Sequence, residues 1–142
     1  MQTAAVLQDK SKAKRPPPLD VGALASAGLR GFFGIAQNWG LAEKECLVLL
    51  GDPSRATYYN WKKGDIGKIG RDTLDRLSYI VGIYKALQIL LPDDGVAHSW
   101  IRNPNDAPLF AGQPPLALML TGQLVDLYRV RAYLDAQRGG WG

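Results

Sequence analysis

Apolar residues recur at intervals of three and four along most of this chain, and this spacing constrains its fold more than any other feature. Residues 21–39, which include Leu24 and Phe32, and residues 72–91, which include Leu77, both have this spacing of apolar residues. Such intervals place the apolar side chains on one face of an α-helix. No segment of useful length alternates apolar and polar residues as a strand does. The chain is therefore predicted to be all-α, with about seven helices and no internal repeat.

Capping and helix-breaking residues divide this pattern into separate elements. Ser54 is a favourable N-cap, Gly64 a favourable stop, and Pro92 ends the long helix before it. Turn residues are dense between positions 103 and 115, where no helix is expected. The predicted helices cover residues 21–39, 41–50, 54–63, 72–91, a short segment ending at 100–101, a segment from Pro114 or Pro115 to Leu120, and a last helix after Gly122.

The net charge of +4 is concentrated in one short segment. Residues 54–71 hold five Lys or Arg against Asp65 alone, which gives +4, whereas residues 1–53 carry +1 and residues 72–142 carry −1. A polyanion is the natural partner of a stretch with this composition.

The same segment belongs to a candidate helix-turn-helix. A short helix, a tight turn at residues 51–53 and a polar helix beginning at Ser54 have the dimensions of that motif. Tyr58 and Trp61 are expected to face the core, which leaves the remaining side chains toward solvent. Arg and Asn can hydrogen-bond base edges, and Lys mostly contacts phosphates. The predicted DNA-binding residues are Arg55, Tyr59, Asn60, Lys62 and Lys63, and the alternative is a solvated face on an ordinary helix.

Few side chains in the sequence could support catalysis or bind a metal. Cys46 and His98 are the single cysteine and the single histidine, which excludes an internal disulfide and leaves too few soft ligands for a structural zinc site. Cys46 is expected to be a buried small hydrophobe. No nucleophile lies beside a base in any recognisable motif. We therefore predict a protein that is not an enzyme and that has no catalytic residue, metal or cofactor.

The apolar runs and the N-terminal residues indicate where the protein is expected to be located. No apolar run approaches the roughly 18 residues of a membrane-spanning helix, and the N-terminus lacks the apolar stretch of a secretory signal. A cytoplasmic protein without a membrane partner is predicted.

Residues 1–19 are basic and rich in proline, which favours a flexible arm: either a disordered tail or an arm for the DNA minor groove. The predicted domains are the helix-turn-helix at residues 20–71 and a helical domain at residues 72–142.

Two series of short motifs resemble the Xre/MbcA/ParS antitoxins. The series Ala36-Gln37-Asn38-Trp39-Gly40-Leu41, Leu49-Leu50-Gly51 and Tyr59-Asn60-Trp61-Lys62-Lys63-Gly64 resembles their Xre/Cro-like helix-turn-helix half. Asn103-Pro104-Asn105, Gly112 and Pro114-Pro115-Leu116 at this spacing resemble their toxin-binding half. The resemblance covers about residues 22–140. Ala42 departs from the pattern, because a Ser or Thr N-cap would be expected there.

This resemblance implies an antitoxin that binds and blocks a RES-domain toxin, which consumes NAD, and that represses its own operon. The partners it implies are the toxin and operator DNA, and residues 72–142 become the dimerisation and toxin-binding domain of a homodimer. A helix-turn-helix regulator that stands alone, and whose C-terminal part only dimerises it, is the alternative function.

The toxin contact is expected at the C-terminal end of the chain. The last helix is expected to present Arg129, Arg131 and Arg138 beside Tyr133, and arginine with aromatic residues is the composition enriched at interface hot spots. A helix stop is predicted after Gln137, followed by a flexible tip. In the family that the chain resembles, the C-terminal region covers the NAD pocket of the toxin. The predicted toxin-binding residues are Arg131, Tyr133, Arg138, Trp141 and Gly142, with an inert tail as the alternative.

Overall fold

The computed structural model describes residues 21–140, and within them it contains seven α-helices, one 3₁₀-helix and no strand. The prediction of an all-α fold is confirmed. The elements are α2 (Val21–Trp39), α3 (Glu43–Leu49), α4 (Arg55–Lys63), α5 (Arg71–Leu90), α6 (Asp94–Ser99), η1 (Trp100–Arg102), α7 (Pro115–Met119) and α8 (Leu124–Gly140). The expected arm at residues 1–19 lies outside the described residues.

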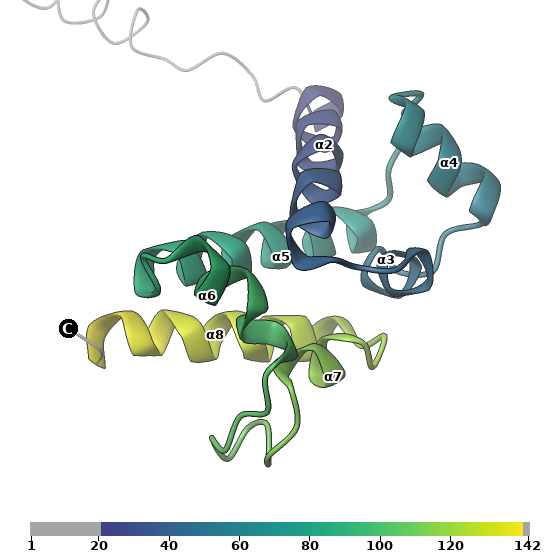
Figure 1. Ribbon diagram of the computed structural model, residues 1–142. Helices are drawn as coiled ribbons and strands as arrows, with labels where there is room; N and C mark the ends of the chain where they lie inside the picture. The colour runs from purple at the N-terminus through teal and green to yellow at the C-terminus, as the bar shows by residue number, and fades with distance from the viewer. Residues whose placement is uncertain (1–20, 141–142) are drawn as a thin grey trace, which may run out of the picture.

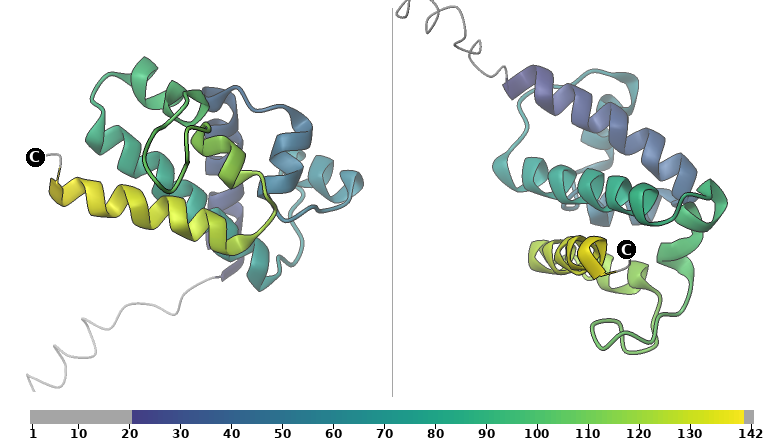
Figure 2. Two further views of the ribbon diagram at one scale, coloured as in Figure 1. Left: turned by 90° about the horizontal axis from the view of Figure 1, so that it is seen from below. Right: turned by 90° about the vertical axis from the view of Figure 1, so that its left-hand side faces the viewer.

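Helix α5 is central to the arrangement (Figure 1). It lies between α2 and α8 and contacts both of them. Helices α3 and α4 lie beyond α2, away from the C-terminal end of α8, and the views in Figure 2 agree with this placement. Helix α4 and the C-terminal end of α8 are therefore at opposite ends of the molecule.

One hydrophobic core runs through all of these layers. It joins Phe32 of α2, Ile80 and Ile83 of α5, and Leu127 and Leu134 of α8, all of them fully buried. Each such side chain contributes roughly 1.5–3 kcal/mol when it is removed from water. The boundary that we expected between residues 71 and 72 falls in the first turn of α5, the helix that packs on both sides.

The predicted helix ends have clear local causes. The Ser54 hydroxyl oxygen accepts a hydrogen bond from the Thr57 amide at 3.1 Å, which caps α4. Gly64 ends that helix with a φ of 91°, a left-handed conformation that favours glycine. Pro115 begins α7, where a missing amide hydrogen costs nothing.

The last helix differs from its prediction. Helix α8 continues through Arg138 and Gly139 to Gly140, so the expected stop after Gln137 is wrong. Glycine lowers helix stability by only about 1 kcal/mol per residue when its backbone stays in the helical region. The packed turns before it, which include Leu134, supply the start from which the helix extends.

The segment between η1 and α7 is a closed loop, as its turn residues predicted. The Asn105 side chain accepts a hydrogen bond from the Ala107 amide at 2.9 Å, and the Asn105 carbonyl accepts one from the Gly112 amide at 2.8 Å. An asparagine side chain that bonds the backbone two residues ahead stabilises a tight turn. The Asn-Pro-Asn motif therefore has a structural role in closing this loop.

Candidate functional site

Helices α3 and α4 and the turn between them form the predicted helix-turn-helix. Gly51 has a φ of 91° in this turn, and Asp52 a φ of 62°. The Asp52 amide donates to the Leu47 carbonyl at 2.7 Å, which ends α3. A Cβ atom at Gly51 would lie 2.8 Å from Oδ2 of Asp72, so only glycine fits there. The turn is fixed by backbone conformation and by close contact with α5.

One face of α4 packs on the core, and the opposite face is exposed. Tyr58 and Trp61 are only 3% and 8% exposed, as predicted. The Tyr58 ring meets the edge of Phe33 from α2, with 5.6 Å between ring centroids. The five predicted DNA-binding side chains all lie on the exposed side: Arg55, Tyr59, Asn60, Lys62 and Lys63.

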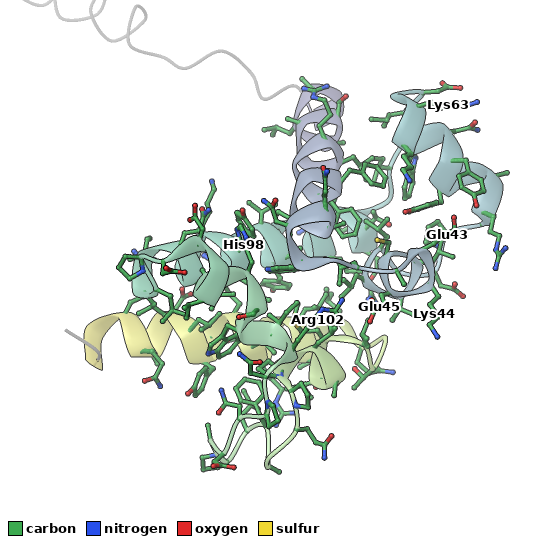
Figure 3. The ribbon with its side chains drawn as sticks, in the orientation of Figure 1. Glu43, Lys44, Glu45, Lys63, His98 and Arg102 are labelled. Carbon is green, nitrogen blue, oxygen red and sulfur yellow. The ribbon has the colours of Figure 1, made fainter. Side chains whose placement is uncertain are left out.

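Tyr59 differs from the other four because its hydroxyl already has a partner. It donates a hydrogen bond to Oε1 of Glu43 on α3. This bond raises the pKa of Tyr59 above its ordinary value. Figure 3 shows Glu43 between α3 and α4 and Lys63 at the far end of α4. This contact between Glu43 and Tyr59, which joins the two helices of the motif, was not predicted from the sequence.

Cys46 lies on the buried side of the motif. It is 3% exposed, as expected for a small hydrophobe. Burial raises the pKa of its thiol above the ordinary value of 9.0. The same cause raises the pKa of Tyr58. Neither group is ionised near neutral pH, so neither adds charge to the motif.

Arg102 links the C-terminal half of the chain to the motif. Its guanidinium donates hydrogen bonds to the carbonyls of Trp39 at 3.0 Å and Gly40 at 2.8 Å, and to Glu45 at 3.3 Å. Oε1 of Glu45 also accepts from the amide of Ala42 at 2.8 Å, which is the half of a capping box that needs no Ser or Thr side chain at position 42. Arg102 and Glu45 point toward one another in Figure 3. The contact between Arg102 and Glu45 was not predicted from the sequence.

Arg76 makes a second link, from the first half of α5. The residue is buried, and its guanidinium donates to Oδ2 of Asp72 at 2.7 Å and to the carbonyl of Gly122 at 2.8 Å. Gly51 lies directly against it. The turn of the helix-turn-helix and the turn before α8 are therefore held by the same side chain.

The predicted toxin-binding residues of α8 are on two different faces. Arg131 lies against Gly82 of α5, and its Nε is 3.1 Å from Oδ2 of Asp135. Arg138 is exposed and follows Arg131 by two helical turns, which puts it on the same side. Trp141 and Gly142 lie outside the described residues.

Tyr133 faces the other way from these two arginines. Its ring stacks on Trp100 with 6.4 Å between centroids and meets the edge of Phe110 at 5.1 Å. The expectation that the arginines lie beside Tyr133 is wrong for Arg131 and Arg138. Residues two apart on a helix point about 200° apart, a separation that the composition of the segment does not reveal.

Residues 21–140 contain no group of three or more His, Cys, Asp or Glu side chains that could hold a metal ion. None of the helices described is both long and apolar enough to cross a membrane.

The fold and its motif define a small helical protein with a helix-turn-helix whose outer helix is cationic. Residues 19–82 match the antitoxin Xre-like helix-turn-helix domain, and residues 86–140 match the antitoxin Xre/MbcA/ParS C-terminal toxin-binding domain. The chain belongs to the Xre/MbcA/ParS antitoxin family. The resemblance seen in the sequence motifs is confirmed, as are the helix-turn-helix and the toxin-binding domain that follows it. These two domain families are generally non-enzymatic.

The chain is also similar to another protein over most of its length. The protein described as "Uncharacterized protein y4oB" from Sinorhizobium fredii (strain NBRC 101917 / NGR234) is 48% identical over 123 residues. The match covers 87% of this chain and 93% of that protein.

Proposed function

We propose that this chain neutralises a RES-domain toxin that consumes NAD, and that it represses its own operon as a homodimer. The observation that carries the proposal is the separation of two surfaces on one core. The cationic face of α4 lies at one end of the molecule and the C-terminal end of α8 at the other. One chain can then bind DNA and a protein at the same time, in the cytoplasm where both are found.

The DNA contact is assigned to the exposed face of α4. Arg55 and Asn60 read base edges in the major groove, and Lys62 and Lys63 contact phosphates. The hydroxyl of Tyr59 is bonded to Glu43, so Tyr59 contributes its ring. A monomer with one such helix reads few base pairs, and a homodimer reads an inverted repeat whose half-sites are about one helical turn, or a multiple of it, apart. Footprinting of the operator tests this, and a single unrepeated half-site contradicts it.

The toxin contact is assigned to the end of α8 and the two residues after it. Arg138 and Trp141 supply a cation and a planar ring, which can fill the space that the dinucleotide needs in the toxin. Deletion of residues 138–142 is expected to abolish protection from the toxin. The deletion leaves Leu134 and the rest of the core in place, so operator binding should persist.

Co-expression with the adjacent reading frame tests the neutralisation proposal directly. We expect the neighbouring protein alone to stop growth and to lower cellular NAD, and the wild-type chain to restore growth and to co-purify with it. A neighbour that is harmless, or that never forms a complex with this chain, contradicts the proposal and favours the regulator that stands alone.

A further inference from the structure

A groove of about 810 Å³ lies between α2 and α8, over the surface of α5. Its lining is mainly apolar and includes Leu77 and Val81. Leu24 of α2 also lines it and is 55% exposed, a large fraction for a leucine. No part of the proposed contacts at α4 or at residues 138–142 uses this surface.

Arg131 of α8 lines the groove, and its guanidinium lies in a recess of α5 at Gly82. A Cβ atom at Gly82 would overlap the Arg131 guanidinium, so glycine at this position allows the guanidinium to lie against the backbone of α5. The Arg131 side chain remains 33% exposed. Its Nε donates to Asp135, and among residues 21–140 its two Nη groups have no hydrogen-bond partner. The fold therefore fixes the position of a guanidinium whose Nη1 lies deepest in the recess, next to Gly82.

Cations outnumber carboxylates in the lining of this groove. It contains Arg71, Lys85 and Arg131; Arg71 is paired with Asp75 at 3.5 Å and Arg131 with Asp135 at 3.1 Å, so Lys85 carries the excess positive charge. Lys85 is exposed and has no ion-pair partner within the part of the chain that the structure describes. A guanidinium edge and an ammonium group beside apolar side chains suit a carboxylate on an amphipathic segment.

We propose that this groove docks an acidic, amphipathic segment of the toxin, with a carboxylate bound by Arg131 and Lys85 and apolar side chains packed beside Leu24 and Val81. The proposal rests on the neutralising function above and assigns it a second contact surface. Complementary charge across the interface favours this occupant.

Charge also argues against one other occupant. Residues 1–20 of the chain carry four Lys or Arg against Asp9 and Asp20, a net charge of the same sign as the unpaired Lys85 of the groove. A partner that supplies a carboxylate neutralises this charge.

The test measures the affinity of the full-length chain for the purified toxin by calorimetry. Arg131→Met removes the charge, and Gly82→Ala keeps the charge but forces the guanidinium out of its recess. We expect each substitution to weaken toxin binding at least about tenfold. Their combination should be no weaker than Arg131→Met alone, because Gly82 acts through Arg131.

Matched controls exist on the same helices. Gly31→Ala changes an exposed glycine of α2 that has nothing within 4 Å of the added methyl. Arg129→Met removes an arginine of α8 that pairs with Asp126 and does not line the groove. Both should bind the toxin as the wild type does. Lys85→Glu, which removes no packing, serves if Gly82→Ala fails to fold, and it too should weaken binding.

The outcomes separate this proposal from the function on which it rests. If the wild type binds the toxin and Arg131→Met and Lys85→Glu bind it equally well, the groove is not the docking site, and neutralisation stands. If the wild type itself does not bind the toxin, the proposed function fails and the docking proposal fails with it. A change from dimer to monomer in Arg131→Met, seen by sedimentation, identifies the groove as an interface between copies and overturns the proposal.

Discussion

The basic residues of α4 and α8 differ in their ion pairing. Arg55, Lys62 and Lys63 of α4 are exposed and form no ion pair with any residue in the described range 21–140. On α8, Arg129 lies 3.1 Å from Asp126 and Arg131 3.1 Å from Asp135. Their carboxylates are three or four residues away on the same helix. The number of unpaired basic residues on a helix therefore indicates a polyanion-binding site better than the number of all its basic residues does.

The ion pairing affects the distance over which each surface attracts a charged partner. Unpaired cations on α4 add to one another and attract a phosphate backbone from a distance. The paired arginines of α8 have little net field, and they act only on groups that come into contact with them. Arg138, which is exposed, adds charge at the C-terminal end of α8.

The largest expected effect comes from removing the packing beneath the cationic face of α4. Trp61→Ala should lower the free energy of unfolding by about 3–5 kcal/mol, because it leaves a cavity under the helix. Urea denaturation followed by circular dichroism measures this. Trp100→Ala should cost less, since Trp100 is only half-buried against Phe110 and Tyr133. An unchanged midpoint for Trp61→Ala would show that α4 does not depend on this contact.

The next effect concerns the residues assigned to base edges. Arg55→Ala or Asn60→Ala should each weaken specific operator binding by roughly 1–3 kcal/mol. Gel shifts with operator and scrambled DNA measure the change. Arg129→Ala is the control on α8, and it should leave operator affinity unchanged. An Arg55→Ala, Asn60→Ala double variant with wild-type affinity would refute the placement of α4 in the major groove.

A smaller effect is expected from the phosphate contacts. Lys62→Ala or Lys63→Ala should weaken binding to all DNA sequences alike and reduce the slope of log affinity against log salt by about 1. A titration at several salt concentrations checks this. A loss confined to the operator sequence would instead assign the lysine to base recognition.

The smallest effect concerns the buried side of the same motif. Because burial raises the pKa of Cys46 above 9.0, its contribution to stability is complete below that pH and is lost as the pH rises beyond it. The unfolding midpoint should therefore fall as the pH increases above 9. Cys46→Ala should reduce that fall, and the raised pKa values of Tyr58 and Tyr59 contribute to what remains. A midpoint independent of alkaline pH would contradict the burial of both groups.

Much of the fold could be predicted from the sequence because its causes are local. The Ser54 cap, the Gly64 stop and the burial of Tyr58 and Trp61 all follow from residues within one or two helical turns. The exposed face of α4 follows from the same periodicity.

The missed contacts are those that join distant parts of the chain. Arg76 and the Gly122 carbonyl are 46 residues apart, and Arg102 and the Trp39 carbonyl are 63 apart. The fit of Arg131 against Gly82 depends on the packing of α8 on α5, which no local pattern reveals. Tyr133 was misplaced for the same reason, since its partners Trp100 and Phe110 come from another part of the chain.

The position of α5 in the shared core affects how the chain is degraded by proteases. The two matched domains meet inside this helix, between residues 82 and 86, and Arg76 near its start holds the turns of both halves. Because one hydrophobic core joins both domains, we expect a protease cut within α5 to unfold both of them. Turnover of the chain would therefore end its hold on DNA and its hold on the toxin in the same event.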